Sequence, residues 1–284
     1  MGPVCSDKGC ACPKHYVLEE GSNMNVSLSD YYKEYKDKYK STSQLIRRVS
    51  ENWFFDNMYC PFCIDGSIIA YENNHPVVDF CCHNCNKEYQ LKAKKYSFGN
   101  KLLDGEYHKM IDAIYSKRAP NFFLLSYTPG MDRIINLILV PKEFILPGII
   151  EKRNPLSQNA RRHGWTGCNI ILESIPAQGK IYSIENGVPI DKDKVRKNVT
   201  AVDYFMKINN VEARGWLNDI LLIISGFRSE IFTLKDLYEF IPRLRKLYPN
   251  NNNIEAKIRQ QLQILRDNDI IEFIGRGVYK KRFN

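Results

Sequence analysis

The sequence lacks long hydrophobic runs and the features of a secreted protein. No apolar stretch approaches the roughly 18 residues that a transmembrane helix needs, and the N-terminus lacks the apolar segment of a secretory signal. These absences predict a cytoplasmic protein, in which cysteine thiols bind metals more often than they form disulfides. No internal repeat is found, and the asparagine run at 250–253 is the one low-complexity tract, so a repeat architecture is not expected.

Acidic residues are also scarce relative to basic ones. There are 32 Asp and Glu residues against 41 Lys and Arg residues, which gives a formal net charge of +9. A positive excess of this size favours a polyanionic partner such as nucleic acid. Hydrophobic residues make up 44% of the 284 residues, enough for a substantial core. At roughly 100–200 residues per domain, the length predicts about two domains.

The chain is predicted to divide into three parts. Residues 1–23 are expected to be a tag or a disordered leader, although their cysteines leave a small extra metal site as an alternative. Residues 24–205 are predicted to form a first domain and residues 212–284 a second. The polar, weakly periodic stretch over 186–211 is predicted to be a linker.

The first domain alternates between helical and strand periodicities. Apolar residues at a spacing of three to four predict helices over 28–58 and 104–117. Short apolar or alternating runs predict strands, the last of which ends at Pro141 because proline cannot donate to a ladder. The order of elements predicts a mixed α/β fold. The predicted strands cover residues 77–80, 88–92, 122–127 and 134–140.

Two cysteine pairs form the strongest local pattern. Cys60 and Cys63 are two residues apart, as are Cys82 and Cys85, with 18 residues between the pairs. Each pair places two thiolates on one turn, and two such turns close a tetrahedral zinc site. A four-thiolate site leaves no position for water, so the ion is predicted to be structural, with redox sensing as the alternative. Cys81 adjoins the second pair but lacks the two-residue gap.

Asp79, Gln90 and Lys92 flank these cysteines. Asp79 ends a predicted strand, and Gln90 and Lys92 lie two apart on the next strand, hence on one face. Phosphodiester hydrolysis uses a carboxylate to hold Mg²⁺, and a lysine can orient the attacking water. The series therefore suggests a nuclease site. Because the same residue types are common on solvated strand faces, that alternative stays open.

The second domain is predicted to be an α+β winged helix. Thr233, with Asp236 three residues later, predicts a capped helix start, and a second helix is predicted over 252–267. A hairpin that turns at Gly275-Arg276-Gly277 follows. In this arrangement the second helix enters the major groove, although winged helices also mediate protein contacts. The residues predicted to contact DNA are Lys257, Arg259, Gln260, Gln261, Gln263 and Arg276.

A basic and aromatic segment lies within the first predicted domain, at residues 161–165. Arg161 and Arg162 are followed closely by Trp165. The guanidinium groups suit phosphate or guanine, and the indole offers an apolar face to a base methyl group. Contact with one methyl group is worth only about 1–3 kcal/mol, which fits a protein with two reading domains. A core tryptophan beside a surface arginine pair is the alternative.

These segments, in order, resemble the DpnI family of methyl-directed restriction endonucleases, which join a zinc-braced PD-(D/E)xK core to a winged-helix domain. The resemblance covers roughly residues 40–284. It is carried by CPFC…NNHPVVDFCCHNCNKEYQLKAKK, Pro120-Asn121-Phe122-Phe123, ARRHGWTGCNI at 160–170 and KIRQQLQILRDNDIIEFIGRG at 257–277.

The resemblance implies roles for several residues and partners. It implies that Asp79 and Lys92 are catalytic and that Gln90 occupies the position of the second metal ligand, with Mg²⁺ as the catalytic ion. It implies a bacterial cytoplasmic protein that acts on double-stranded DNA containing methylated adenine, with no membrane and no protein partner. The zinc ligands that it implies are Cys60, Cys63, Cys82 and Cys85.

Gln90 departs from the family pattern, which has glutamate there. Its carbonyl oxygen can still bind Mg²⁺, but a negative charge is lost, so metal affinity is expected to fall unless a neighbouring acid such as Glu88 helps. Three functions therefore remain. One is a Mg²⁺-dependent endonuclease that cuts at adenine-methylated GATC sites, and another is a methylated-DNA-binding protein with weak or no cleavage. A structure-specific nuclease without methyl dependence is a third.

Overall fold

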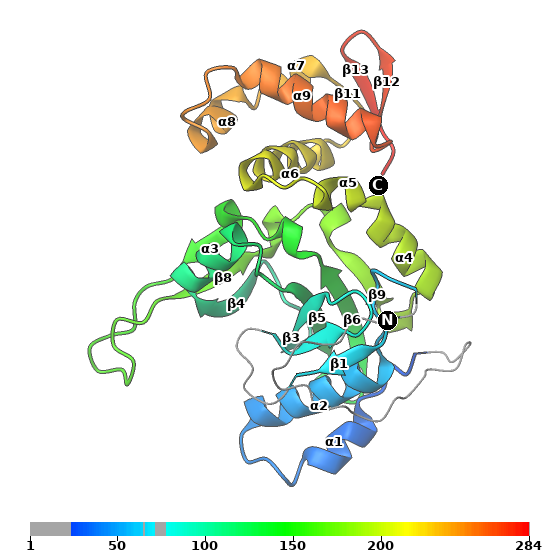
Figure 1. Cartoon of the computed structure of the whole chain (residues 1–284), viewed down its shortest axis with the longest axis vertical. Helices are drawn as coiled ribbons and strands as arrows, with labels where there is room; N and C mark the ends of the chain where they lie inside the picture. The colour runs from blue at the N-terminus through cyan, green and yellow to red at the C-terminus, as the bar shows by residue number, and fades with distance from the viewer. Residues whose placement is uncertain (1–23, 65, 72–77, 284) are drawn as a thin grey trace, which may run out of the picture.

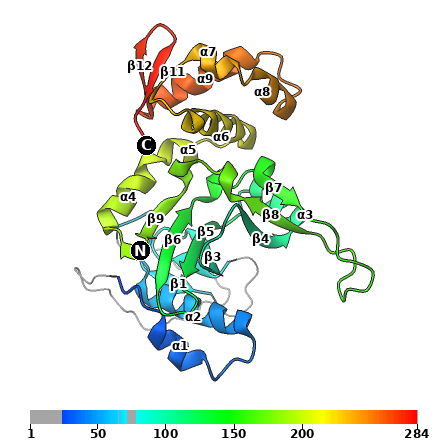
Figure 2. The same cartoon turned by 180° about the vertical axis from the view of Figure 1, so that it is seen from behind.

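The computed structural model describes residues 24–64, 66–71 and 78–283. Figure 1 shows a mixed α/β body with a smaller helical and β module at one end. In the view from behind, α6 (Val211–Gly226) lies between the body and this module (Figure 2). The predicted fold class, α/β followed by α+β, is confirmed. The predicted leader at 1–23 and the start of the strand predicted over 77–80 lie outside the described residues.

The body is built on a seven-stranded sheet. Its strands in spatial order are β1 (Ile68–Ala70), β2 (Phe80–Cys82), β3 (Glu88–Lys95), β5 (Asn121–Tyr127), β6 (Ile134–Val140), β9 (Ile181–Glu185) and β10 (Val188–Pro189). Neighbouring strands are antiparallel except β3 and β5, which run parallel. Every residue of β5 is buried, as expected for a strand covered on both faces.

A second, three-stranded sheet contains the strand that follows β3 in the chain. Its antiparallel strands in spatial order are β4 (Lys101–Glu106), β8 (Gly167–Ile171) and β7 (Ile150–Lys152). From β4 the chain enters α3 (Tyr107–Tyr115) and then β5, so β4 and α3 form the crossover that parallel neighbours require. The loop over 153–166, between β7 and β8, projects away from the body in both views (Figures 1 and 2).

Aromatic packing joins the first helices to the large sheet. α1 (Ser29–Tyr35) precedes α2 (Thr42–Asn57), and α2 packs against β1 and β3. The ring of Phe54 is fully buried, with its centroid 4.7 Å from that of Phe80 and 4.8 Å from that of Phe123. This contact sets α2 over β3, the strand that carries Gln90 and Lys92. Short 3₁₀ helices among the described residues cover Lys142–Phe144, Pro147–Ile149, Leu172–Ser174 and Ala177–Gly179.

The C-terminal module has the element order of a winged helix. Thr233 and Asp236 form a capping box at the start of the first helix after β11, as predicted. Pro242 lies in the first turn of the next helix, where a proline is tolerated, so it begins a helix and does not kink one. The elements are β11 (Ile231–Thr233), α7 (Leu234–Tyr238), α8 (Ile241–Leu247), α9 (Ile254–Asp267), β12 (Ile271–Gly275) and β13 (Val278–Lys281), with sheet order β11-β13-β12.

α6 contacts both parts of the molecule. On one side the Asn218 amide donates a hydrogen bond of 3.1 Å to the Ser174 carbonyl of the body. On the other, the Trp216 ring stacks on Tyr248 of the module, with centroids 3.8 Å apart. Both α6 side chains are buried, so the module is attached through a packed interface.

The single helix predicted over 28–58 is wrong. Tyr31, Tyr32 and Tyr35 belong to α1, and α2 begins a new helix after Ser41, whose φ of −85° and ψ of 121° are extended. The linker predicted over 186–211 is also wrong. It contains β10, α4 (Lys192–Ala201) and α5 (Asp203–Met206). The sparse apolar residues of this polar stretch share one face, and Val195, Val199, Val202 and Phe205 are all buried.

Two other predicted boundaries move. The helix predicted over 104–117 begins at Tyr107, because residues 101–106 pair with β8 as strand β4. Glu106 then caps the helix by accepting hydrogen bonds from the backbone N–H groups of His108 and Lys109. Within the strand predicted over 77–80, regular pairing begins only at Phe80, so Asp79 lies just before β2.

Candidate active site and zinc centre

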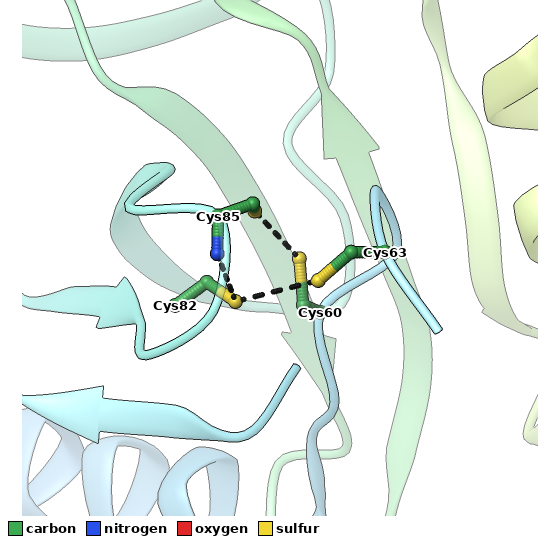
Figure 3. Close-up of side chains that lie close together, drawn as sticks. All are labelled: Cys60, Cys63, Cys82 and Cys85. Carbon is green, nitrogen blue, oxygen red and sulfur yellow. Dashed lines mark hydrogen bonds between the residues drawn. The ribbon is translucent and has the colours of Figure 1, made fainter. Parts of the chain in front are cut away.

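The four predicted zinc ligands lie together. Figure 3 shows the sulfur atoms of Cys60 and Cys63 facing those of Cys82 and Cys85. The Sγ atoms of Cys60 and Cys85 are 3.5 Å apart, those of Cys63 and Cys82 are 3.6 Å apart, and all four lie within 4.8 Å of one another. A tetrahedral site with Zn–S bonds of about 2.3 Å has sulfur–sulfur edges of about 3.8 Å. The four side chains therefore fit a structural zinc ion.

Two contacts tie the cluster to its surroundings. The backbone N–H of Phe62 points to Cys60 Sγ at 3.4 Å, the kind of outer contact that orients a metal ligand. The Tyr89 hydroxyl, from β3, lies 3.0 Å from the same sulfur. Because Tyr89 is fully buried in the strand that carries the other predicted site residues, the cluster and β3 are held in fixed relation.

Gly66 lies directly against the thiolates. A Cβ atom added at this position would overlap Cys63 Sγ and would lie 2.6 Å from Cys82 Sγ. The Cys60 N–H donates a hydrogen bond of 2.9 Å to the Gly66 carbonyl, so the backbone there cannot move away freely. Glycine is therefore required by space at this position.

We expect Gly66→Ala to weaken the zinc centre. Overpacking a rigid site costs about 1–3 kcal/mol, and here the added methyl group displaces metal ligands. Zinc content by atomic absorption and the thermal unfolding midpoint should both fall. Gly148→Ala is the control, because a Cβ atom there meets nothing within 4 Å. Full zinc content in Gly66→Ala would contradict the prediction.

Asp79, Gln90 and Lys92 line one pocket of about 510 Å³. The structure thus brings together side chains from two separate segments. Their roles in the pocket stay predictions. The pocket is lined by α2, by Asp79 just before β2, by β3 and by the start of β4. Its other polar lining residues include Ser43, Arg47, Ser50, Glu51, Lys94 and Lys101.

The Asp79 carboxylate is partly buried and is hydrogen-bonded to β3. The backbone N–H of Asp79 donates to the Tyr89 carbonyl at 3.0 Å, and its carboxylate accepts from the Leu91 N–H at 2.9 Å. Burial raises the pKa of Asp79, whereas the Leu91 N–H and the positive charges of Arg47 and Lys92 oppose that rise. An ionised Asp79 therefore depends on positive charge close by.

Lys92 has an acidic partner that sequence patterns did not indicate. Its Nζ atom lies 2.7 Å from Asp104 Oδ1, and the Asp104 side chain is only 6% exposed. Asp104 belongs to β4, so the ion pair joins the second sheet to β3. Placing Asp104 in a predicted helix over 104–117 hid this contact, since only the strand β4 directs the carboxylate to Lys92.

Gln90 presents an oxygen atom without a partner. Its Oε1 atom is buried and accepts no hydrogen bond from any described residue. Mg²⁺ prefers oxygen ligands, so the Asp79 carboxylate and this Gln90 oxygen fit a divalent cation. Glu88, the neighbouring acid named above, is not among the described lining residues of the pocket, and its carboxylate lies 3.4 Å from the Tyr71 hydroxyl. A residue two positions away on β3 shares a face with Gln90 but lies further along the strand.

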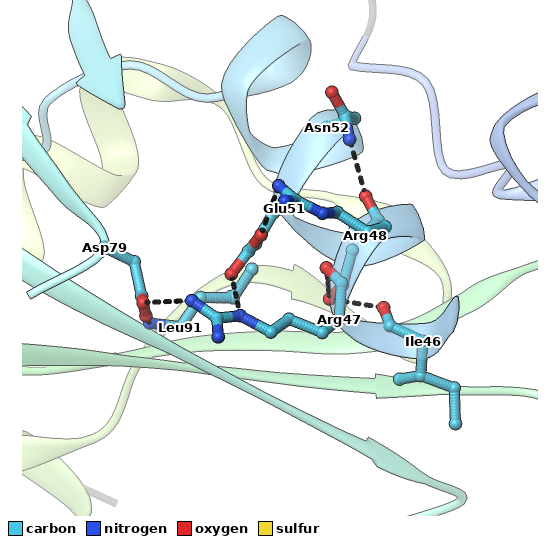
Figure 4. A network of polar contacts seen from close by, with 8 residues as sticks. Ile46, Arg47, Arg48, Glu51, Asn52, Asp79 and Leu91 are labelled. Carbon is cyan, nitrogen blue, oxygen red and sulfur yellow. Dashed lines mark hydrogen bonds and ion pairs between the residues drawn. The ribbon is translucent and has the colours of Figure 1, made fainter. Parts of the chain in front are cut away.

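Arg47 and Glu51 of α2 also line the pocket, and no sequence motif indicated them. The Arg47 guanidinium lies between two carboxylates, with Nε 2.5 Å from Glu51 Oε1 and Nη2 3.7 Å from Asp79 Oδ1 (Figure 4). Burial raises the pKa of Glu51, partly offset by Arg47. An arginine four residues from a glutamate is an ordinary helix-surface pair, so the sequence could not single it out.

The predicted DNA-contacting loop is exposed, but Trp165 is not a free aromatic. Arg161 and Arg162 are exposed in the projecting loop over 153–166. The Arg162 guanidinium stacks over the Trp165 ring at 5.1 Å from its centroid, and a Cβ atom on Gly167 would lie 2.9 Å from the ring. Trp165 is thus half-buried between these neighbours, and a methyl group would compete with Arg162 for the same face.

One of the predicted DNA contacts in α9 is wrong. Gln261 is 1% exposed and forms the buried face of α9 with Ile258 and Leu262, so its amide cannot reach DNA. Arg259, Gln260, Gln263 and Arg276 are exposed, and Lys257 is half-buried. Arg259 also contacts Tyr238 and Glu255, which limits its freedom. Composition does not show which of two neighbouring glutamines is buried. The orientation of the helix about its axis decides which side chain faces the core and which faces solvent.

We expect Gln260→Ala to affect DNA binding and Gln261→Ala to affect stability. Gln260→Ala should weaken DNA binding by about 1–3 kcal/mol if the amide reads a base, and leave the thermal midpoint unchanged. Gln261→Ala should lower the midpoint, because it leaves a cavity in the core of the module, while affecting DNA binding little. Fluorescence anisotropy with labelled duplex and thermal unfolding measure the two effects. A loss of affinity in Gln261→Ala alone would contradict the assignment.

Among the described residues, no helix is both long enough and apolar enough to cross a bilayer. Two family models match the chain. That of DpnI, described as the Dam-replacing family, matches residues 24–207, and that of the DpnI C-terminal domain, described as the Dam-replacing HTH domain, matches residues 212–281. These matches place the α/β body among restriction endonucleases and the C-terminal module among DNA-binding domains. The chain therefore belongs to the DpnI, or Dam-replacing, family, and the resemblance seen in the sequence is confirmed.

Proposed function

We propose that the protein is a methyl-directed restriction endonuclease that hydrolyses phosphodiester bonds of double-stranded DNA at adenine-methylated GATC sites with Mg²⁺. The observation that carries the proposal is that Asp79, Gln90 and Lys92, which come from two separate segments, line a single pocket. Family membership supports the reaction class. The net charge of +9 is consistent with a DNA substrate.

The side chains of the pocket suit this reaction. Asp79 and the unpaired Oε1 of Gln90 would hold Mg²⁺, which when bound activates water and offsets charge on the phosphate. Lys92, held by Asp104, would orient the attacking water and stabilise the developing negative charge. Zinc would hold the turns at residues 60–63 and 82–85 in place, as a structural ion.

Two exposed regions would read the DNA. Arg161 and Arg162 extend on the projecting loop over 153–166, and the polar face of α9 carries Gln260 and Gln263. Arginine side chains suit guanine and phosphate, and glutamine suits adenine. With two DNA-contacting regions, each would gain a small binding free energy from a methyl group, and the two contributions would add. The proposed domains are residues 24–205 for catalysis and 212–284 for binding.

Digestion of matched plasmids tests the proposal. Two copies of one plasmid, with and without adenine methylation at GATC, are incubated with zinc-loaded protein and Mg²⁺. We expect cutting of the methylated copy only, into fragments that map to GATC, and no cutting without added Mg²⁺. Equal cutting of both copies would overturn methyl dependence and indicate a structure-specific nuclease.

A second function is favoured by Gln90. Because this residue carries no charge where the family has an acid, the protein would be a methylated-DNA reader with weak or no cleavage if no other carboxylate compensates. Tight binding of methylated duplex without cutting at any Mg²⁺ or Mn²⁺ concentration would establish this function and overturn the first. Anisotropy and digestion on the same preparation separate the two.

A further inference from the structure

We infer that Glu51 of α2 is an additional carboxylate ligand of the catalytic cation and that Arg47 occupies the place of that cation when none is bound. The inference rests on the proposed function, since it concerns the same pocket. It assigns to α2 a metal-binding role, whereas the sequence motif places the metal ligands only in and next to β2 and β3.

The first argument is the composition of the pocket. Among its described lining residues, Asp79 and Glu51 are the two acids. Asp104 and Glu88 are outside the described lining, and Asp104 is paired with Lys92 of β3 at 2.7 Å, whereas both arginine partners of Glu51, Arg47 and Arg48, lie on α2 itself. Glu51 is therefore the carboxylate available to replace the charge that Gln90 lacks. With Asp79 and Glu51 together, the two positive charges of Mg²⁺ would be balanced.

The second argument is the position of a positive charge. Figure 4 shows the Arg47 guanidinium lying between Glu51 and Asp79, which come from different elements. Two partly buried carboxylates, 16% and 18% exposed, attract a cation to the space between them. Mg²⁺ is bound in proteins through one or two carboxylates and further oxygen ligands, and the Gln90 Oε1 atom without a described partner supplies such an oxygen.

The third argument is that Arg47 is free to leave. Its side chain is 56% exposed, and α2 does not need to move for the guanidinium to swing out to solvent. Once displaced, the guanidinium would lie at the rim of the pocket, where a DNA phosphate would approach. Glu51 would stay in place, because its helix is fixed by the buried rings of Trp53 and Phe54.

Calorimetric titration with Mn²⁺ on the zinc-loaded full chain tests the inference without measuring cleavage. We expect Glu51→Gln and Asp79→Asn each to weaken Mn²⁺ binding by about tenfold or more, as loss of a charged ligand should. Arg47→Ala should bind Mn²⁺ at least as tightly as the natural protein, since the guanidinium between the Glu51 and Asp79 carboxylates is gone. The control is Glu34→Gln, which removes an exposed acid of α1 outside the described pocket lining.

The outcomes separate the inference from the proposed function. Mn²⁺ affinity of Glu51→Gln within about twofold of the natural protein, with binding lost in Asp79→Asn, would overturn the role of Glu51 and leave the proposed site intact. A tenfold loss in Arg47→Ala would overturn the role of Arg47 as a stand-in for the cation. Failure of the natural protein to bind Mn²⁺ would overturn the metal site itself.

A measurement on the unmodified protein covers the case in which Glu51→Gln does not fold. Fe²⁺ with ascorbate and peroxide cuts the backbone close to a bound divalent cation, and the cuts are mapped by mass spectrometry. We expect Mg²⁺-competed cuts near residues 51, 79 and 90. Cuts near 79 and 90 without any near 51 would contradict the assignment of Glu51.

Discussion

Asp79→Asn should abolish Mg²⁺-dependent cutting of methylated plasmid while DNA binding stays nearly intact. The substitution keeps the shape of the side chain and its acceptor for the Leu91 N–H, but removes the charge that would hold the cation. A metal ion contributes several kcal/mol to such a reaction, and each 1.36 kcal/mol is tenfold in rate, so we expect a loss of about a thousandfold or more. Single-turnover digestion measures the rate and anisotropy measures the binding.

Glu88→Gln is the matched control for this experiment. Both acids flank the cysteine cluster, but Glu88 lies outside the described lining of the pocket and near the Tyr71 hydroxyl. We expect its cleavage rate to change little. Wild-type cutting by Asp79→Asn would remove Asp79 from the mechanism, and a comparable loss in Glu88→Gln would show that the pocket geometry does not identify the metal ligands.

Removal of the zinc ion should destabilise the α/β body severely. The cluster joins the turn after α2 to the end of β2, and Tyr89 carries that connection into β3. Structural zinc sites contribute about 10–16 kcal/mol of apparent binding free energy in small domains, so the thermal midpoint should fall on the order of 10 °C or more. Thermal unfolding with and without a zinc-selective chelator measures the effect, and added zinc should restore the midpoint.

Adjacent cysteines supply the control for the zinc prediction. Cys82→Ser removes a ligand of the cluster and should lose zinc and stability, whereas Cys81→Ser changes a residue outside the cluster and should keep both. Zinc content by atomic absorption distinguishes the two variants. If Cys81→Ser released zinc and Cys82→Ser retained it, the ligand assignment from the spacing would be refuted.

Local sequence spacing alone predicted some features of the site and of the fold. The C-x-x-C pairs predicted a cluster whose sulfur atoms do meet, because two thiolates two residues apart lie on one turn whatever the rest of the chain does. The capping box of Thr233 and Asp236 and the buried strand at 121–127 were likewise predictable, since capping and strand burial depend on neighbours in sequence. Family motifs further indicated which side chains face the pocket.

Other parts depended on contacts between distant elements. Glu51 reaches the site because α2 packs against β3, and Asp104 reaches it because β4 directs its carboxylate to Lys92. No spacing within either segment records these contacts. Gln261 differs from Gln260 only by a rotation of about 100° on α9, which decides whether the amide meets core or solvent. The polar stretch 186–211 contains helices because its few apolar side chains are buried against the core of the body, which stabilises the helical turns.

By itself, therefore, the sequence determined the four cysteines that cluster, the order of the two modules and three residues that line the pocket. Only the tertiary structure decided which acids surround Lys92 and Asp79, and which glutamines face outward. The physical reason is range: a turn or a cap is set by residues a few positions apart, whereas the charge balance of a pocket is set by side chains that packing brings together from separate elements.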